Sequence, residues 1–392
     1  MTPAPTQFEP AVLHDLRAAE GIFEFISTFS GKELSLQKQL RDRHPDHVVR
    51  AALILHDLRK RAAGKFNRAA EMWFDRTALE QSTSEAVANY KSQRFSGEVV
   101  DVCAGIGGDS IALASRCTVT SIDRNEARGL CLGWNAEAYG VRDKIDVQSR
   151  DAAIEDTTGK LVHIDPDRRA GQRGRSLRID DLEPGPEFLR KLMQTARGGA
   201  IKLSSASNFR GSFDDAEVEL ISSRGECKEA TVWFGELQTD CALRATHVES
   251  GETIAGALSY DMAEVVPPKQ YIFDPDPALV RSGLLDQFCL EHNISRLDAE
   301  EEYLTSHELP ESAFLYGSFE RLAELPNDGK SLKKFVRENN IGRIEIKSRH
   351  ISTDVEKLRR SLKLKGSEAA TAIVAKLDGN TRVLVCRRSG SC

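Results

Sequence analysis

Between residues 98 and 203, short apolar runs alternate along the chain with stretches of helical periodicity. We predict strands over 98–103, 118–122, 145–147, 161–164 and 200–203, and helices over 107–114, 125–139 and 186–195. Such alternation is typical of a parallel sheet with helices on both of its faces. Two further strands, 217–222 and 229–234, are expected to close the sheet.

The rest of the 392 residues allows for two more domains, at roughly 150 residues per domain. Residues 1–95 are predicted to form a helical domain, with helices over 11–27, 46–63 and 83–95, the last capped by Ser82 or Thr83. Residues 96–245 hold the sheet, and 246–330 hold a linker and the start of a C-terminal region. Residues 331–392 are predicted to be a small α+β domain, with strands at 314–316, 344–346, 372–375 and 383–386 and a helix over 354–362. The predicted fold class is therefore α/β, with a Rossmann-like sheet between these two domains.

Composition excludes several classes of protein. No apolar run approaches the ~20 residues that cross a membrane. Residues 1–10 lack a basic segment followed by an apolar one, so we expect no secretory signal. None of the eight cysteines forms a CxxC pair, and no histidines are spaced around them as in a zinc site. We therefore expect reduced thiols, a cytoplasmic location and no bound metal.

Positive charge is concentrated at the C-terminal end. Residues 331–392 hold 15 Lys and Arg against 6 Asp and Glu, although the whole chain has a net charge of −6. Lys and Arg neutralise phosphates, so this excess suggests a polyanion such as RNA as a partner. A solvated basic surface explains it equally well. A second basic cluster, at Arg59, Lys60, Arg61, Lys65 and Arg68, leaves the same two interpretations open.

A glycine-rich turn follows the first predicted strand, in the sequence VVDVCAGIGGDS at residues 99–110. A dinucleotide-binding fold needs G-x-G-x-x-G, and the third glycine is replaced here by Ser110. Asp101 and Asp109 would repel a pyrophosphate but suit a cationic ligand, such as the ammonium and sulfonium of S-adenosylmethionine. The cofactor-binding candidates in this turn are Asp101, Cys103, Ala104, Gly105, Gly107 and Asp109.

Two acidic residues after later strands are further candidates for the cofactor. Asp123, followed by Arg124, ends the second strand 22 residues after Asp101, where an acid typically binds ribose hydroxyls. Alternatively, Asp123 caps the following helix. Asp151 follows the third strand and is placed to accept a hydrogen bond from an adenine amino group, with a surface turn as the alternative.

Residues after the fourth strand are the catalytic candidates. Ligands of open parallel sheets bind outside the carboxyl ends of the strands, where Asp165 and Pro166 lie. A carboxylate and a backbone carbonyl can together accept two N–H bonds of an exocyclic amine and aim its lone pair at a methyl group. A simple Asp-Pro turn is the alternative.

A basic loop follows at once. It contains Arg168, Arg169, Arg173, Arg175 and Arg178 without an acid between them. Such a loop suits phosphate clamping, and we name Arg168, Arg169 and Arg173 as substrate-binding candidates. A solvated loop is the alternative.

These motifs resemble those of a known family. Together with SIDRN (121–125), NAEAYG (135–140), KID (144–146) and TVWFGE (231–236), the glycine turn resembles class I S-adenosylmethionine-dependent methyltransferases. The greatest similarity is to the trimethylguanosine synthase group, which methylates a guanine N2 amine in RNA; WFD (73–75) and TSE (83–85) resemble the segment before its catalytic domain. RIEIK (343–347) and LKLKG (362–366) resemble a THUMP-like domain, which makes Arg343 and Lys347 substrate-binding candidates.

The resemblance implies S-adenosylmethionine as cofactor and an RNA base amine as substrate. One motif departs from it: amine methyltransferases of this type usually carry Asp/Asn/Ser-Pro-Pro-aromatic, whereas this chain has Asp165-Pro-Asp-Arg168. Trp233 and Phe234 are candidates for the missing stacking surface, unless the strand buries them. Two alternative functions stay open: an RNA-binding protein with weakened catalysis, and a nicotinamide-dependent oxidoreductase. The oligomeric state is not predicted.

Overall fold

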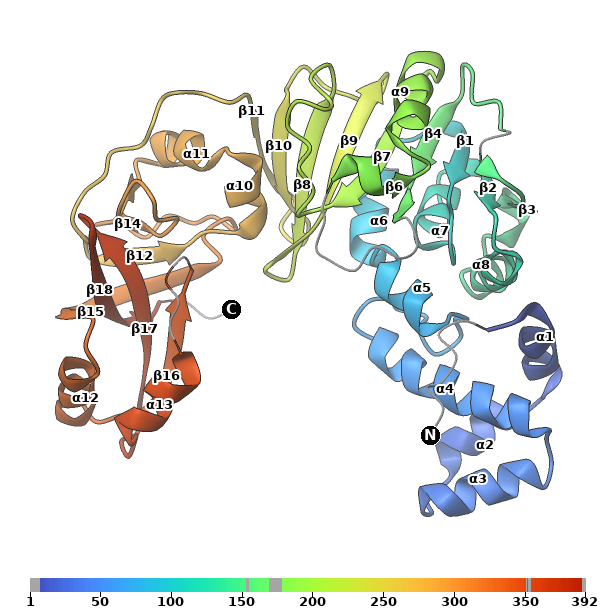
Figure 1. Ribbon diagram of the computed structural model, residues 1–392, viewed down its shortest axis with the longest axis horizontal. Coiled ribbons are helices and arrows are strands. Elements are labelled where there is room, and N and C mark those ends of the chain that lie inside the picture. Colours follow the sequence, from blue (N-terminus) through green and yellow to red (C-terminus); the bar gives the residue numbers. More distant parts are fainter. Residues whose placement is uncertain (1–7, 153–154, 169–177, 350, 352–353, 390–392) are drawn as a thin grey trace. The chain divides into compact units, whose positions relative to one another are not determined.

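The computed structural model describes residues 8–152, 155–168, 178–349, 351 and 354–389 (Figure 1). The chain divides into two compact units. One comprises residues 1–217 with 230–240, and the other comprises 218–229 with 241–392. No helix in the described ranges is long and apolar enough to span a membrane.

The first unit begins with six helices. They are α1 (Pro10–Ala18), α2 (Ile22–Thr28), α3 (Glu33–Arg41), α4 (Asp46–Ala62), α5 (Arg76–Gln81) and α6 (Glu85–Ser92). The single helix predicted over 11–27 is wrong, because Gly21 adopts a left-handed φ of 71° and separates α1 from α2. The prediction of a Ser82 or Thr83 cap is also wrong: α6 begins after Ser84. The apolar residues of α4, among them Val48, Ala52 and Leu55, are buried as their spacing predicts.

A nine-stranded sheet follows, and it confirms the predicted Rossmann-like α/β fold. Its order is β11-β10-β8-β9-β7-β4-β1-β2-β3, and the strands β7, β4, β1, β2 and β3 pair in parallel. The strands are β1 (Gly97–Val102), β2 (Cys117–Asp123), β3 (Ile145–Ser149), β4 (Leu161–Ile164), β7 (Gly198–Ser204), β8 (Glu217–Ser223), β9 (Glu226–Gly235), β10 (Leu243–His247) and β11 (Glu252–Gly256). The helices between them are α7 (Gly108–Ala114), α8 (Glu126–Ala138) and α9 (Pro186–Thr195), with the short turns η1 (Arg142–Lys144) and η3 (Ile179–Asp181) and a small ribbon of β5 (Asp167–Arg168) and β6 (Leu182–Glu183).

The C-terminal part forms a second, seven-stranded sheet of order β13-β14-β12-β15-β18-β17-β16. Its strands are β12 (Tyr271–Asp274), β13 (Ser295–Arg296), β14 (Leu304–Ser306), β15 (Gly317–Pro326), β16 (Ile341–Ser348), β17 (Glu368–Leu377) and β18 (Asn380–Arg388). Its helices are α10 (Pro277–Ser282), α11 (Leu285–His292), α12 (Gly329–Glu338) and α13 (Val355–Leu362). Apolar residues of α12 and α13, such as Leu332, Val336 and Leu362, pack on β16 and β17 in one core.

Two sequence predictions for this region need correction. Residues 314–316 are not a strand, since β15 begins at Gly317. The segment 246–330, predicted to hold a linker and the start of a C-terminal region, contributes not only β15 but also the three short strands β12, β13 and β14 to the second sheet. The sequence hides these strands because they are only two to four residues long, which is too short to show a period.

Candidate active site

The glycine-rich turn between β1 and α7 has three residues in the left-handed region of backbone conformation. Gly105 and Gly107 have φ values of 57° and 89°, and Cys103 is left-handed as well, with φ of 59°. A Cβ atom on Gly107 would lie 2.9 Å from Cγ of Leu132. The turn therefore needs glycine at position 107 for its conformation and for its close approach to α8.

Two adjoining hollows lie around this turn. The first is lined by residues from β1, α7 and the end of β4, and the second by residues from the ends of β2 and β3. Cys103 and Asp167 line both. The first hollow holds the catalytic candidate Asp165 and five predicted cofactor-binding residues: Asp101, Cys103, Ala104, Gly105 and Asp109. The second hollow holds the predicted cofactor-binding residues Cys103, Asp123, Arg124 and Asp151. Gly107 and Pro166 are not among the described lining residues.

Asp123 is held in place by two backbone amides. Its Oδ2 accepts from the Gly105 N–H at 2.8 Å, and its Oδ1 accepts from the Asn125 N–H at 2.8 Å. The side-chain cap of α8 is Asn125, which accepts from the Arg128 N–H at 3.2 Å. Each carboxylate oxygen of Asp123 keeps a further lone pair for a ligand. Burial raises the pKa of Asp123 above its usual value, against the effect of these hydrogen bonds.

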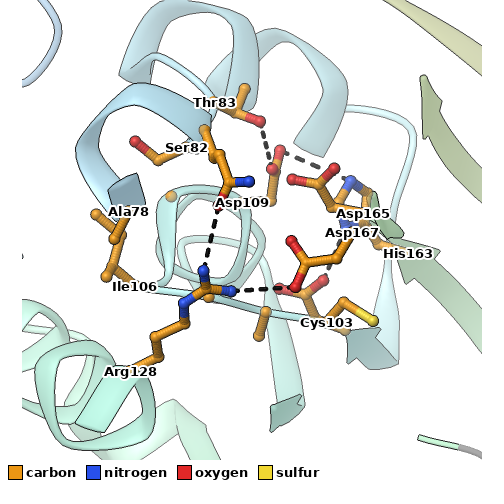
Figure 2. A pocket seen from close by; sticks show the side chains of 15 residues that line it. Ala78, Ser82, Thr83, Cys103, Ile106, Asp109, Arg128, His163, Asp165 and Asp167 are labelled. Carbon is orange, nitrogen blue, oxygen red and sulfur yellow. Dashed lines mark hydrogen bonds and ion pairs between the residues drawn. The ribbon is translucent and has the colours of Figure 1, made fainter. Parts of the chain in front are cut away.

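A buried network of charges supports the floor of the first hollow (Figure 2). Lys91, on α6, lies 2.8 Å from Oδ1 of Asp109, and Thr83 donates to Oδ2 of Asp109 at 2.6 Å. On β4, His163 Nδ1 lies 2.7 Å from Oδ1 of Asp101, and its Nε2 lies 3.4 Å from the Lys91 ammonium. The two acids therefore already have cationic or N–H partners within the protein.

This network corrects the electrostatic prediction for Asp101 and Asp109. Asp109 is 8% exposed and Asp101 1% exposed, so neither is a free anion waiting for a cation. Burial opposes ionisation of Asp109, but Lys91 and His163 outweigh it and hold the pKa of Asp109 well below its usual range. Burial also lowers the pKa of His163, but Asp109 and Asp101 outweigh it, so that the pKa of His163 is raised overall.

The catalytic candidate Asp165 forms an ion pair with Lys202 on β7. The Lys202 ammonium lies 2.5 Å from Oδ2 of Asp165 and also donates to the backbone carbonyl of Gln81 at 3.2 Å. No described residue is seen to hydrogen-bond Oδ1 of Asp165. Burial raises the pKa of Asp165 above its usual value, and the Lys202 ammonium opposes this rise.

The helical segment before the sheet forms one wall of the first hollow. Ala78, Gln81, Ser82 and Thr83 line it, and the Gln81 Oε1 accepts from Arg128 Nη2 at 3.2 Å. Arg128 Nη1 also lies 3.2 Å from Oδ2 of Asp167 (Figure 2). The sequence motifs did not identify Lys91, His163, Lys202, Gln81 or Arg128, because the partners of these residues are far away along the chain.

The buried side-chain amide of Asn135 also attaches this helical segment to the sheet. Asn135 on α8 accepts from the Trp73 N–H at 2.7 Å and donates to the Trp73 carbonyl at 3.0 Å and to the Ile106 carbonyl at 2.9 Å. The Trp73 ring packs edge-on against Trp134 at 4.9 Å. Asn135 thus joins the segment that leads to α5 to the glycine-rich turn.

The candidate stacking residues and the N-terminal basic cluster are largely used within the fold. Trp233 is fully buried beside Phe95, and Phe234 is 2% exposed, so neither is a stacking surface for a substrate. Arg59 lies over the Phe23 ring at 4.1 Å, and Lys65 donates to the Leu79 carbonyl at 2.7 Å.

The predicted substrate-binding residues lie in different surroundings. Arg168 ends β5, and its side chain lies outside the described part of the structure, as do Arg169 and Arg173 entirely. Arg343 is exposed on β16. Lys347 lies 3.0 Å from Oδ2 of Asp274, and Arg349 lies 2.6 Å from Oδ1 of the same carboxylate, so these two cations stabilise the second sheet.

This chain is similar to known families and proteins over most of its length. Residues 96–167 match the family model of RNA cap guanine-N2 methyltransferases, and residues 317–388 match the model of the THUMP domain-like family. Two Mycobacterium tuberculosis proteins, from strains CDC 1551 and H37Rv, are 32% identical over 353 residues, which is 85% of this chain and 95% of each relative. Both are described as uncharacterized S-adenosylmethionine-dependent methyltransferases.

The fold has a counterpart over nearly its whole length. A crystal structure from Porphyromonas gingivalis W83, of a protein assigned as a methyltransferase, superimposes with a TM-score of 0.79 at 19% identity, covering 98% of this chain and 100% of that chain. At that identity the likeness concerns the fold alone. The relatives from M. tuberculosis identify the family and, with it, S-adenosylmethionine as the cofactor. The chain belongs to the S-adenosylmethionine-dependent methyltransferases and carries a THUMP-like domain at residues 317–388.

Proposed function

We propose that this methyltransferase modifies an amine of a base in RNA, of guanine type, with Asp165 as the residue that orients the amine. The observation that carries the proposal is the position of Asp165. It follows β4 at the carboxyl edge of the sheet and lines the hollow beside the glycine turn. The match of residues 96–167 to the RNA cap guanine-N2 methyltransferase model supports the choice of substrate class.

The residues of the two hollows fit S-adenosylmethionine. We assign Cys103, Ala104 and Gly105 to one end of the cofactor, with Asp101 buried beneath them, and Asp123 and Asp151 to its ribose and adenine. Asp123 is fixed by the amides of the turn and still has acceptor capacity, which suits a pair of ribose hydroxyls. When bound, this cofactor supplies a methyl group that its sulfonium has already activated.

Positioning is then the main task of the protein. Lys202 fixes Oδ2 of Asp165, and Oδ1 accepts one N–H of the amine while the Pro166 carbonyl accepts the other. With both N–H bonds held, the nitrogen lone pair is aimed along the line of transfer, and such alignment supplies much of the rate. The ammonium of Lys202 favours the ionised form of Asp165, because it opposes the pKa rise caused by burial.

Transfer of a tritiated methyl group from S-adenosylmethionine to total RNA, followed by nucleoside analysis, tests the proposal. We expect label in a base-methylated guanosine. Label in protein only, or no transfer at all, would contradict it. RNA binding without transfer would instead favour a binding protein with weakened catalysis, consistent with the altered tetrad at 165–168.

A further inference from the structure

A third hollow opens at the same edge of the first unit as Asp165. It lies between the start of α9 and the turn that follows β7, and its volume is about 430 Å³. Sites for small ligands typically have volumes of about 300–1,000 Å³. Leu189 and Phe213, which are 1% and 8% exposed, provide apolar surface inside it. Its size therefore suits a ligand as large as a nucleotide.

Three arginines from three different segments line this hollow. Arg178 precedes η3, Arg190 lies in α9, and Arg210 lies in the turn after β7. All three are exposed, and the described residues offer none of them an ion pair. Asp180 is the one described acid among the lining residues. Three unpaired guanidinium groups against one carboxylate, in a chain whose net charge is −6, make a local site for an anion.

The topology places this hollow beside the catalytic candidate. β4 and β7 are neighbouring parallel strands, with Ile164 opposite Ile201 in the register. The segments after both strands therefore leave the sheet at its carboxyl edge, Asp165 directly after β4 and Arg210 six residues after β7 ends. Substrates of such sheets bind outside this edge.

We infer that Arg178, Arg190 and Arg210 form a binding site for the phosphodiester backbone of single-stranded RNA, next to the nucleotide presented to Asp165. Guanidinium groups bind phosphate oxygens through two parallel N–H bonds, and such contacts fix the strand without reading its sequence. The strand is single because a base inside a duplex cannot place its amine in the first hollow. The identity of the methylated nucleotide rests on the proposed function; the anion site rests on the arginines.

The test is binding of a fluorescent 12-nucleotide oligouridylate to the full chain at two salt concentrations. The double variant Arg190→Gln with Arg210→Gln loses two phosphate contacts, each of which contributes about 0.7 to the salt slope for a single strand. We expect about tenfold weaker binding at 0.15 M salt and a slope reduced by about 1.4.

A matched control removes two cations from the opposite edge of the sheet. Arg116 and Lys144 are exposed and precede β2 and β3, so Arg116→Gln with Lys144→Gln makes the same change in net charge at the amino ends of the strands. Affinity of this control within twofold of the parent supports the site. Equal losses in both double variants, full affinity in Arg190→Gln with Arg210→Gln, or no binding by the parent chain would each overturn it.

Two further measurements keep this inference separate from the proposed function. Calorimetric titration with S-adenosylhomocysteine is expected to give the same affinity in the parent and both double variants, which shows that each is folded. Methyl transfer to total RNA by the parent chain tests the function alone. If the parent transfers methyl groups but the Arg190 and Arg210 changes leave oligouridylate binding unaffected, the anion site alone is refuted. If these changes weaken binding but the parent transfers no methyl group, the proposed function alone is refuted.

Discussion

Removing one partner of the buried ion pair between Lys91 and Asp109 should destabilise the first unit. The Lys91 side chain is 2% exposed, and its ammonium lies 2.8 Å from the Asp109 carboxylate. Replacing one member of a buried pair leaves the other charge without a partner, which typically costs about 3–5 kcal/mol. Since Asp109 keeps the hydrogen bond from Thr83 at 2.6 Å, we expect Lys91→Met to lower the free energy of unfolding by about 3 kcal/mol.

Urea unfolding followed by circular dichroism measures this change in the free energy of unfolding, and two further variants serve as controls. Lys91→Met combined with Asp109→Asn removes both charges and should recover most of the loss. Arg61→Met removes an exposed cation that lies 2.8 Å from Asp57, and should change the free energy of unfolding by less than about 1 kcal/mol. If Lys91→Met proves no more destabilising than Arg61→Met, the network is not the support described here.

Three further predictions concern the turn, the pH dependence and the catalytic carboxylate. Gly107→Ala should lower thermal stability more than Gly140→Ala, because both have positive φ but only the Cβ at 107 meets a neighbour, at 2.9 Å; equal losses would contradict the packing argument. The pKa of His163 is higher in the folded protein than in the unfolded chain, so protonation of His163 stabilises the fold. This stabilisation is complete below about pH 6.5 and is lost as the pH rises through the raised pKa. In His163→Gln, the free energy of unfolding should not show this decline with rising pH. If the decline persists in the variant, another group than His163 causes it. When turnover is measured as a function of pH, Lys202→Met should shift the acidic limb to higher pH, because the pKa of Asp165 rises without the ammonium. An unshifted limb would show that Lys202 does not favour the ionised form of Asp165.

The sequence predicts the central sheet well because its signals are local. A strand, a glycine turn and a helix lie within residues 97–114, and Asp123 follows at the spacing expected for a second strand. The structure bears out these elements to within a few residues. The short strands β12, β13 and β14 lack such a local signal and were missed.

The partners of the site acids are the part that the sequence does not reveal. His163 and Asp101 are 62 residues apart, and Asp165 and Lys202 are 37 apart, so only the tertiary fold brings them together. The same is true of Lys347, whose charge suggests a nucleic-acid contact but whose ammonium pairs with Asp274, 73 residues away. Charge counted along a sequence therefore does not separate a binding surface from an internal ion pair.

The most direct test of the central claim is methyl transfer to total RNA by the parent chain and by Asp165→Asn, with S-adenosylhomocysteine affinity measured in parallel. If Asp165 orients the amine, the variant should transfer methyl groups to base-methylated guanosine about 100-fold more slowly, since a misplaced reactant costs about that factor. Its affinity for S-adenosylhomocysteine should be unchanged. Transfer at the parent rate in Asp165→Asn, or label that never appears in an RNA base, would contradict the account.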